Sequence, residues 1–545
     1  MTPRKRPVVL IIRDGWGHNP HPEWNRANAV HLARTPVNDR LVAEYPSTRI
    51  HTSGEDVGLP AGVMGNSEVG HQNIGAGRIV NQEVMRITRA ILQGSFFERP
   101  NLKGAFEQAS KTGGSVHLIG LVSDGRVHSD LDHALAIVDL CKKLDFDGQR
   151  FFVHAITDGR DTSPNSGLGF VGGLADHLKK TGKGRIASII GRYYAMDRDH
   201  RWERVEAAYR LLTQGADTIF FSSQAAIQHY YGHPSEPSRK GDEFITPSSI
   251  APGGRIESAQ CISSGDSVIF FNYRGDRPRE LSKAFVLPDG QWQAVQGGGF
   301  DRGKRVSDLF YATMTGYERG LPVQVIFDKP SRMTNILGAY LSQKGLRQFR
   351  SAETEKYPHV TFFFNDYRDE PFPGEDRRII PSPRDVSTYD QKPEMSAYPV
   401  TEEVLSRIAS GVYDLMVLNY ANADMVGHTG SLQAAIQAVE VVDRCLGKVV
   451  EATLKQGGAV VVSADHGNCE QMIDPQTGGP HTAHTTYDVD LIVADKESKS
   501  LPLRPGGRLA DIAPTLLDLM GIKKPKEMSG ESLRVSRKDA KSAKK

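Results

Sequence analysis

Three apolar segments of the sequence run into residues of the types that bind metal ions. Residues 7–12, 413–420 and 459–464 are apolar and β-branched, and polar groups follow them: Asp14, then Asp424 with His428, then Asp465 with His466. Ligands of open α/β sheets bind beyond the carboxyl ends of the strands, so these side chains are expected at one edge of a sheet. Carboxylate and imidazole together suit Zn, Mn, Co or Fe, whereas a wholly oxygen site suits Mg or Ca. Each residue alone could be a helix cap or a hydrogen-bonded strand end, but together the groups predict a metal site.

The spacing inside these groups is informative. Asp424 and His428 stand four residues apart, so on a helix they share one face and can bind one ion. Asp465 and His466 are adjacent, which on an extended strand would send them to opposite faces unless the chain turns or the pair lies between two ions. His481 and His484 follow the same apolar segment, and we expect one of them to complete a site.

Ser67 lies in MGNSEVGHQNIGAG, where two interpretations stand side by side. The glycines allow close backbone approach and SEVGHQ could begin a helix whose free amides attract an anion, which would make Ser67 a nucleophile toward a phosphoryl group. Paired metal ions could lower the pKa of its hydroxyl for that purpose. Alternatively Ser67 is the N-cap of that helix, because Ser is a preferred capping residue. The residues alone leave both open.

A different chemistry occupies the middle of the chain. Four apolar segments there run into arginine-bearing motifs, SDGRVHS, TDGRDTS, GRYYAMDRDHR and NYRGDRPRE, which contain Arg126, Arg160, Arg192, Arg198, Arg274 and Arg277. Guanidinium groups match phosphate and carboxylate oxygens in pairs, so these arginines predict a small polyanionic substrate. One such arginine alone would be assigned to a surface salt bridge, but four matched positions argue against that.

The elements that must position these residues are of the α/β class. Short apolar runs alternate with longer helix-like segments, as in βαβ units with a parallel sheet. Metal-binding residue types lie before about residue 80 and after about 420, and the arginine motifs lie between them. We therefore expect a discontinuous metal-binding domain, residues 1–81 and 323–545, interrupted by a substrate-binding domain, residues 82–322. The Gly-rich piece 291–305 is expected to be an exposed loop.

Composition excludes several classes of function. The chain has 545 residues, and 67 Lys and Arg against 65 Asp and Glu give a formal net charge of +2, so no bulk charge favours nucleic acid or a membrane surface. No apolar run approaches the roughly 18 residues of a spanning helix or resembles a signal peptide. The four cysteines form no CxxC pair and are expected to be reduced. These features predict a cytoplasmic protein with no nucleic-acid or membrane partner.

Ten motifs, in order, resemble those of cofactor-independent (2,3-bisphosphoglycerate-independent) phosphoglycerate mutase, a family of the alkaline phosphatase superfamily. The resemblance runs from about Pro7 to about Asp511 and is carried by VVLIIRDGWG, MGNSEVGHQNIGAGR, SDGRVHS, ITDGRDTSP, GRYYAMDRDHRWER, NYRGDRPRE, AETEKYPHVTFFFN, NYANADMVGHTG, SADHGN and HTAHTT. It implies an alkaline-phosphatase-like parallel-sheet domain interrupted by a second α/β domain, and a monomer.

The resemblance also implies roles for individual residues. One metal ion would be held by Asp424, His428 and His484, and a second by Asp14, Ser67, Asp465 and His466, the ions being usually manganese or magnesium. Substrate contacts would come from His128, Arg160, Asp161, Arg192, Arg198, Arg274, Arg277 and Lys356, with Arg126 a lesser candidate. The implied reaction interconverts 3-phosphoglycerate and 2-phosphoglycerate through phosphorylated Ser67, with Asp161 as the acid or base for the glycerate hydroxyls and Lys356 adding positive charge.

Two rival functions and three departures accompany this resemblance. A phosphatase or sulfatase of the same superfamily would share the metal ligands but not require four arginine-bearing strand ends. A non-catalytic metal-dependent binding module would not require Ser67. Arg13 stands where the family has an apolar residue, Asp366 and Tyr367 replace a glycine-rich pair, and 291–305 resembles an addition without an assigned role. Strand alternation should point Arg13 away from Asp14.

Overall fold

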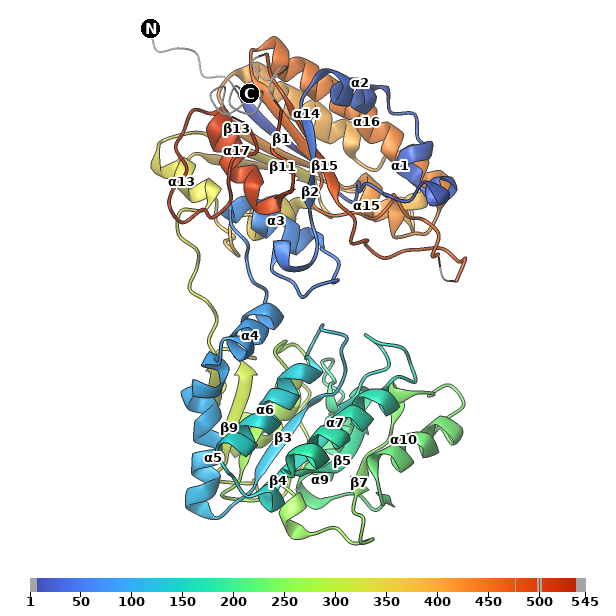
Figure 1. Ribbon diagram of the computed structural model, residues 1–545, viewed down its shortest axis with the longest axis vertical. Helices are drawn as coiled ribbons and strands as arrows, with labels where there is room; N and C mark the ends of the chain where they lie inside the picture. The colour runs from blue at the N-terminus through green and yellow to red at the C-terminus, as the bar shows by residue number, and fades with distance from the viewer. Residues whose placement is uncertain (1–6, 476, 497–498, 500–501, 536–545) are drawn as a thin grey trace, which may run out of the picture. The chain divides into compact units, whose positions relative to one another are not determined.

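The computed structural model describes residues 7–475, 477–496, 499 and 502–535, and the chain divides into two compact units (Figure 1). Unit 1 consists of Met1–Gln82 and Ser331–Lys545, and unit 2 of Glu83–Pro330. Each unit contains one large sheet covered by helices, which confirms the predicted α/β class. In the described part of the chain, no helix has the length and apolar character needed to cross a membrane.

The sheet of unit 1 has eight described strands, and five adjacent strands run parallel to one another. Their order is β12-β11-β13-β1-β14-β15-β2-β16, with β12 at Glu375–Ile380, β11 at Gln348–Glu353, β13 at Leu415–Tyr420, β1 at Val8–Arg13, β14 at Ala459–Ser463, β15 at Val489–Ala494, β2 at Ser47–His51 and β16 at Gly507–Arg508. The first five are parallel to one another, but β15 is antiparallel to both β14 and β2. The expectation of a parallel sheet was therefore wrong for β15. A fully buried strand is apolar on both faces whichever way its neighbour runs, so the pattern does not report direction.

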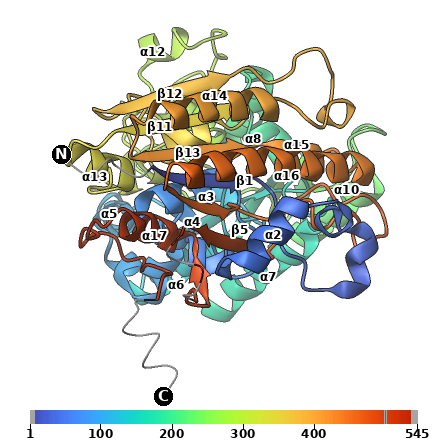
Figure 2. The same cartoon turned by 90° about the horizontal axis from the view of Figure 1, so that it is seen from above.

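Helices cover both faces of this sheet because its central strands are apolar on both faces (Figure 2). On one face α14 (Ala397–Ser410) packs on α16 (Leu432–Lys455), and α16 also contacts β1 and β14. On the other, α3 (Ser67–Ala76) packs against α17 (Ile512–Leu519) and α13 (Leu337–Gln343). The long helix α16 buries residues such as Ala435, Ala438, Val442 and Leu446 at three- and four-residue spacing, which is one stripe of a helix.

The sheet of unit 2 repeats this design. Its order is β10-β9-β8-β3-β4-β5-β7-β6, with β10 at Gln324–Phe327, β9 at Phe310–Thr315, β8 at Ser267–Phe270, β3 at Val116–Leu121, β4 at Phe151–Thr157, β5 at Arg185–Gly191, β7 at Ser248–Ile250 and β6 at Ile219–Phe220. All described pairs are parallel except β5 with β7. Alternate residues of β3 enter two different cores, Leu118 one and Ile119 the other. One core also includes residues of α6 (Leu131–Lys143) and α7 (Gly167–Thr181), the other residues of α9 (Trp202–Gln214) and α11 (Pro278–Val286) (Figure 1).

The piece 291–305 is not simply an exposed loop, so that expectation was wrong in part. It begins in a short helix, α12 (Asp289–Gln293), and two of its side chains are buried, Trp292 at 3% and Arg302 at 7% exposure. Many of the residues between them are exposed, as expected. A large aromatic ring in a Gly-rich segment was the available sign that the segment is anchored.

The departure at Asp366 and Tyr367 has a backbone explanation. Both residues adopt left-handed backbone angles, with φ of 55° and 60°. Glycine takes this conformation at little cost, whereas other residues take it rarely. The Asp366 carboxylate accepts a hydrogen bond from the Met333 amide at 2.6 Å and one from the Gln72 side chain at 3.3 Å, which help to hold the turn.

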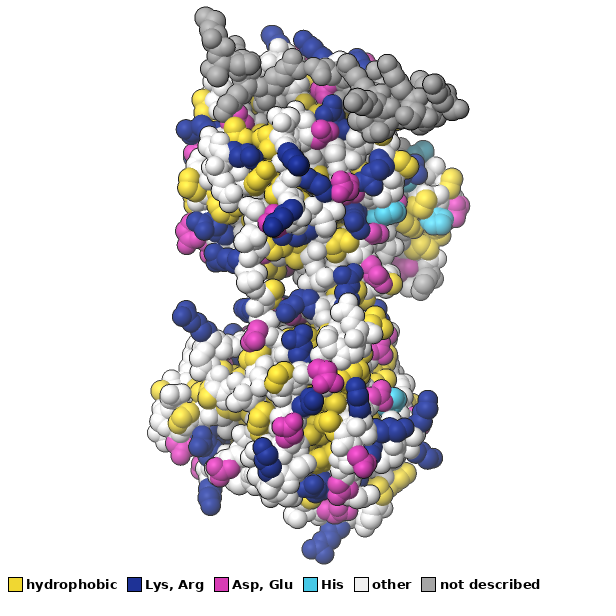
Figure 3. Space-filling model, turned by 60° about the vertical axis from the view of Figure 1, so that its left-hand side comes forward, with side chains coloured by type: hydrophobic (Ala, Val, Ile, Leu, Met, Phe, Trp, Pro, Cys, Tyr) yellow, Lys and Arg dark blue, Asp and Glu magenta, His cyan; other side chains and the backbone are white. Residues whose placement is uncertain are grey.

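Charge is mixed on the surface that Figure 3 draws. On that face Lys and Arg side chains are interspersed with Asp and Glu, in keeping with the formal net charge of +2. A surface of this kind creates no extended field of one sign over the face in view.

Close packing of α3 makes a first prediction. A Cβ atom added at Gly75 would lie 2.0 Å from the Phe364 carbonyl oxygen, which follows the π-helical turn His359–Phe363. We expect Gly75→Ala to lower the free energy of unfolding of unit 1 by about 1–3 kcal/mol, as overpacking does. Urea unfolding measures this change.

Gly173 provides the matched control, because a Cβ there would meet nothing within 4 Å and the residue lies within α7. Gly173→Ala should stabilise unit 2 by about 0.5–1 kcal/mol through higher helix propensity. Unchanged or increased stability in Gly75→Ala would contradict the tight seating of α3.

Candidate functional site

Four adjacent parallel strands of unit 1 bring the predicted metal ligands together. The strands β11, β13, β1 and β14 are neighbours in that order, and their carboxyl ends are followed by Lys356, Asp424, Asp14 and Asp465 respectively. Parallel strands end at the same edge, so residues hundreds of positions apart become neighbours. All four side chains are buried.

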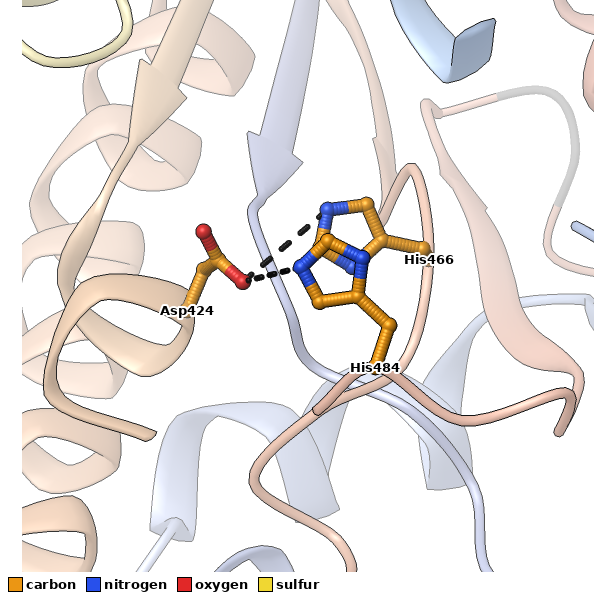
Figure 4. A group of neighbouring side chains, drawn as sticks. All are labelled: Asp424, His466 and His484. Carbon is orange, nitrogen blue, oxygen red and sulfur yellow. Dashed lines mark ion pairs between the residues drawn. The ribbon is translucent and has the colours of Figure 1, made fainter. Parts of the chain in front are cut away.

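The first group of ligand atoms surrounds the Asp424 carboxylate (Figure 4). Asp424 Oδ1 lies 3.1 Å from His484 Nε2, 3.2 Å from His428 Nε2 and 4.0 Å from His466 Nε2. Asp424 and His428 do share one face, because the short helix α15 (Asn422–Gly427) separates them by one turn. Of the two histidines that follow β14, His484 is the one in this group, and its ring stacks on His466 with 3.9 Å between centroids.

Backbone carbonyls orient the two imidazoles. His428 Nδ1 lies 2.7 Å from the Thr482 carbonyl oxygen and His484 Nδ1 lies 2.9 Å from that of Gly65. A ring nitrogen that donates to a carbonyl leaves the other nitrogen as a lone-pair donor, the usual arrangement of metal-binding histidine. Nε2 of both residues is therefore the atom presented to an ion beside Asp424.

The second group lies at the ends of β1 and β14. Asp14, Asp465 and His71 offer ligand atoms within 4.8 Å of one another, and all three are fully buried. His466 Nε2 lies 3.4 Å from Asp14 Oδ1 and 3.6 Å from Asp465 Oδ2, so the adjacent pair 465–466 does turn inward on both residues.

His71 is a member that the sequence analysis missed. It lies in α3 four residues after Ser67, and its Nδ1 is 2.8 Å from the Ser67 carbonyl oxygen and 3.2 Å from Asp465 Oδ2. The side-chain amide of Asn419, near the end of β13, donates to Asp14 Oδ2 at 2.7 Å. The same nitrogen lies 3.1 Å from His71 Nε2. The four-residue spacing from Ser67, which places both residues on one helix face, was the signal that could have found His71.

Ser67 is not the N-cap of α3, so that interpretation was wrong. Asn66 caps the helix by accepting the Val69 amide at 2.9 Å, and Ser67 is the first helical residue. The Ser67 hydroxyl is thus free to face the ligand groups, 3.2 Å from Asp14 Oδ1 and 3.0 Å from His466 Nε2.

Lys356 lies at the centre of the charges. Its ammonium donates to Ser67 Oγ at 2.6 Å, Asp14 Oδ1 at 2.7 Å and Asp424 Oδ2 at 2.6 Å. Burial alone would lower the pKa of this ammonium, but the carboxylates of Asp14, Asp424 and Asp465 raise it well above its ordinary value. Lys356 is therefore a permanent positive charge in contact with the Ser67 oxygen.

Burial and neighbouring charges shift the pKa values of the acids and imidazoles in this site. Burial, with the neighbouring Asp465 carboxylate, raises the pKa of Asp14 to about 7. Burial also lowers the pKa of His466 to about 4, so this imidazole is neutral near pH 7. Neutral imidazole is the form that binds metal ions.

The donor set fits divalent cations. Three buried carboxylates face a single buried ammonium, which leaves negative charge that a cation would compensate. The mixture of carboxylate oxygen with imidazole nitrogen is the donor chemistry of Mn, Co, Fe and Zn sites.

Unit 2 uses its strand ends in the same way for arginine. The strands β8, β3, β4 and β5 are neighbours, and after them come the segments with Arg274 and Arg277, His128, Asp161 with Arg160, and Arg192 with Arg198. Arg192 is 2% exposed and donates to Asp158 Oδ1 at 2.6 Å and to Asp161 Oδ2 at 2.5 Å. His128 Nε2 lies 3.8 Å from Asp161 Oδ2. Burial and Arg192 lower the pKa of His128 to about 4, so its ring is neutral.

Arg274 and Arg198 both pair with Asp276, a residue that the sequence analysis did not single out. Its carboxylate lies 3.2 Å from Arg274 Nε, 3.3 Å from Arg198 Nη1 and 3.5 Å from His128 Nδ1. Burial lowers the pKa of Arg277, and the neighbouring positive charges of Arg192, Arg198 and Arg160 lower it further. Mutual repulsion of this kind is expected where a polyanion is to be bound.

Arg126 and Arg160 pair with carboxylates other than those of Asp161 and Asp276. Arg126 pairs with Asp130 at 3.1 Å, four residues further along the chain. Arg160 Nη1 lies 3.4 Å from Glu243 and its side chain is more than half exposed.

Arg13 points away from Asp14, as strand alternation requires. It is fully buried, donates to Asn38 Oδ1 at 2.7 Å and lies over the Trp16 ring at 4.4 Å.

Comparison with known proteins first gives the class. Residues 6–524 match the Metalloenzyme superfamily. Among relatives, the 2,3-bisphosphoglycerate-independent phosphoglycerate mutase of Rhodopirellula baltica is 66% identical over 97% of this chain and 97% of its own length. That of Gloeothece citriformis is 49% identical over 97% and 95%. The chain thus belongs to the 2,3-bisphosphoglycerate-independent phosphoglycerate mutase family.

A solved structure supports the same fold. The crystal structure of Leishmania mexicana phosphoglycerate mutase at low cobalt concentration is 31% identical and superposes with a TM-score of 0.65, covering 98% of each chain.

The charge balance at Lys356 makes a second prediction. In protein stripped of metal ions, Lys356→Met should lower the free energy of unfolding of unit 1 by about 3–5 kcal/mol, because Asp14 and Asp424 lose their buried partner. With saturating Mn²⁺ the loss should be much smaller, since bound cations supply positive charge to the same carboxylates. Urea unfolding with EDTA and with Mn²⁺ measures both values.

The exposed Lys344 provides the control, and Lys344→Met should change stability by less than about 0.5 kcal/mol in either condition. An equal loss for Lys356→Met with and without Mn²⁺ would show that Lys356 acts through packing alone.

Proposed function

We propose that this chain interconverts 3-phosphoglycerate and 2-phosphoglycerate, without 2,3-bisphosphoglycerate, by passing the phosphoryl group through Ser67. The observation that carries this proposal is the position of the Ser67 hydroxyl, 2.6 Å from the Lys356 ammonium and in contact with Asp14 and His466. A serine oxygen beside a permanent cation and a set of metal-type ligands is suited to accept a phosphoryl group. The names of the relatives support the same activity.

The metal-binding residues would hold two divalent ions. Asp424, His428 and His484 are proposed for one ion, and Asp14, Ser67, Asp465 and His466 for the other. When bound, the ions would lower the pKa of the Ser67 hydroxyl and neutralise the phosphoryl oxygens. The mixed oxygen and nitrogen donors favour Mn²⁺, with Mg²⁺ as the alternative.

The protein's own groups then account for the transfer. The Ser67 oxygen, once deprotonated, attacks phosphorus, and the bond from phosphorus to the glycerate oxygen breaks. The other glycerate hydroxyl then attacks phosphorus, and the bond from phosphorus to the Ser67 oxygen breaks, which returns the phosphoryl group to glycerate. Lys356 stabilises the Ser67 oxygen whenever it carries negative charge. Asp161 is proposed to give a proton to the departing glycerate oxygen and to take one from the attacking hydroxyl.

Unit 2 is proposed to be the substrate-binding domain and unit 1 the metal-binding domain. Arg192 and Arg198 would hold the substrate carboxylate, and His128 and Arg160 would orient it beside Asp161. Arg274 and Arg277 are proposed to bind phosphoryl oxygens of the substrate, and Lys356 is proposed to contact the phosphoryl group that Ser67 carries. We further propose that the protein acts as a cytoplasmic monomer on this small molecule, in keeping with an activity of glycolysis and gluconeogenesis.

An activity assay tests the proposal. Purified protein with Mn²⁺ and no 2,3-bisphosphoglycerate should convert 3-phosphoglycerate to a product that enolase consumes. Release of inorganic phosphate instead would identify a phosphatase and overturn the mutase proposal. A phosphatase would share the same metal ligands, so the assay must distinguish it from a mutase.

Ser67→Ala is the companion variant. It should lower kcat by at least about 10³-fold, because it removes the nucleophile, while Mn²⁺ binding measured by calorimetry largely survives on the six remaining ligands. Retained turnover in Ser67→Ala would remove Ser67 from the proposed role.

A further inference from the structure

Residues 291–302, called here the anchored segment, are attached to unit 2 by two buried side chains. Trp292 donates its indole hydrogen to the Phe300 carbonyl oxygen at 2.9 Å and packs edge-on against the Phe300 ring at 5.1 Å. Arg302 donates to the Ala284 and Leu287 carbonyl oxygens, at 2.8 and 2.7 Å, at the end of α11. Trp292 also belongs to a core of unit 2 that includes Phe285 and Leu287. The segment is therefore held at both ends, although much of its middle is exposed.

Between Trp292 and Arg302 the segment contacts the side chain of Trp202. The Trp202 indole donates to the Gln296 carbonyl oxygen at 2.8 Å, and its ring meets that of Trp292 edge to face at 5.1 Å. Gly297 has a left-handed φ of 81°, and a Cβ there would lie 2.8 Å from the Trp202 indole nitrogen. Glycine is required at this position both by its backbone angle and by this close approach.

Trp202 is the point at which a turn joins α9. It is the first residue of α9, and residues 197–201 immediately before it form the turn that carries Arg198. Asp197 closes this turn by accepting hydrogen bonds from the amides of Asp199 and Arg201, both at 2.9 Å. The Trp202 side chain is 6% exposed, so its seating determines where the turn ends.

The turn is strained enough to need this support. His200 has a left-handed φ of 58°, and its amide donates to the buried carboxylate of Glu280 at 3.3 Å. Non-glycine residues adopt this conformation at a cost and keep it only where surrounding contacts hold it.

Arg198 itself has few contacts to define its position. Its side chain is 45% exposed, and among the described residues its one ion pair is with Asp276 at 3.3 Å. A long side chain held by one partner samples several rotamers, so the place from which it reaches a ligand is set mainly by its backbone.

We propose that the anchored segment positions Arg198 for binding phosphoglycerate, by seating Trp202 and thereby fixing the turn 197–201. This inference rests on the proposed function, in which Arg198 holds the substrate carboxylate. Preorganising a charged group lowers the conformational cost of binding, so the effect belongs in substrate affinity rather than in the chemical step. It gives the Gly-rich segment 291–302 the role that the sequence did not assign.

Two variants disturb the contact between the anchored segment and Trp202 but leave Arg198 unchanged. Trp202→Phe keeps an aromatic ring but removes the hydrogen bond to Gln296, and Gly297→Ala places a methyl group against the indole. Tyr230→Phe is the matched control, because it also removes side-chain hydrogen bonding inside unit 2 but lies in α10 (Ser223–Gly232). The Tyr230 hydroxyl contacts Ser248 Oγ at 3.0 Å and accepts from the Thr246 hydroxyl at 2.6 Å.

Enolase-coupled kinetics with 3-phosphoglycerate should separate affinity from chemistry. For Trp202→Phe and Gly297→Ala we expect KM to rise roughly fivefold, the scale of one lost hydrogen bond, with kcat within about twofold of the parent. In an Arg198→Ala background, the same substitutions should raise KM no further, because the positioned group is gone. Tyr230→Phe should leave KM unchanged.

Hydrogen exchange supplies a readout that needs no reaction. The amides of Asp199 and Arg201 should exchange faster in Trp202→Phe and Gly297→Ala than in the parent, and at the parent rate in Tyr230→Phe. If the parent protein shows no mutase activity, the proposed function fails, and exchange alone judges whether the anchored segment holds the turn.

Three results would overturn the inference. One is unchanged exchange at these amides in both variants. A second is an unchanged KM when exchange is faster, which would make the segment structural only. The third is an equal rise of KM with and without Arg198, or no effect of Arg198→Ala on KM, since either would show that the segment does not act through Arg198.

Discussion

The burial of three carboxylates beside a single lysine is the constraint on which unit 1 depends. Asp14, Asp424 and Asp465 lie at the ends of the neighbouring strands β1, β13 and β14, with Lys356 after β11 as their shared ammonium. Buried charges are costly unless they are paired, so the arrangement persists only because strand order, helix α3 and the surrounding histidines hold every partner in place. The same concentration of negative charge is what makes the edge of this sheet suited to cations and, through Lys356, suited to a negatively charged Ser67 oxygen.

Unit 2 applies the same topology to the opposite charge. Neighbouring strands deliver arginines to one edge, and acidic side chains keep them in place: Asp158 and Asp161 for Arg192, and Asp276 for Arg198 and Arg274. These acids limit the repulsion among guanidinium groups but leave several of them exposed to solvent. The same parallel-sheet design thus gives one unit an edge lined by carboxylates and imidazoles and the other an edge lined by arginines, by a change in the residues that follow the strands.

The sequence predicted these edges well because apolar runs report burial and the residue after a run reports chemistry. Asp14, Asp424, Asp465 and the arginines were found in that way. The sequence could not show that β15 runs antiparallel, because the apolar pattern of a buried strand is the same whether it runs parallel or antiparallel to its neighbours. Nor could it choose between cap and nucleophile for Ser67, since that depends on Asn66 taking the capping position. His71 and the anchoring of 291–302 left one signal each in the sequence, the four-residue spacing from Ser67 and a Trp in a Gly-rich piece. The contacts that define them, and the pairing of Asp276 with Arg198, join residues on different elements and are seen only in the folded structure.

If the phosphoryl group passes through Ser67, rapid acid quenching should trap it on that residue. Protein mixed with Mn²⁺ and 3-phosphoglycerate labelled in the phosphate should be quenched within a few turnovers, digested and analysed by mass spectrometry. Labelled phosphate should appear on the peptide that contains Ser67, and it should form and disappear at rates that match product formation. Labelled 2-phosphoglycerate formed without any phosphate on Ser67, or with phosphate on a different residue, would contradict transfer through Ser67.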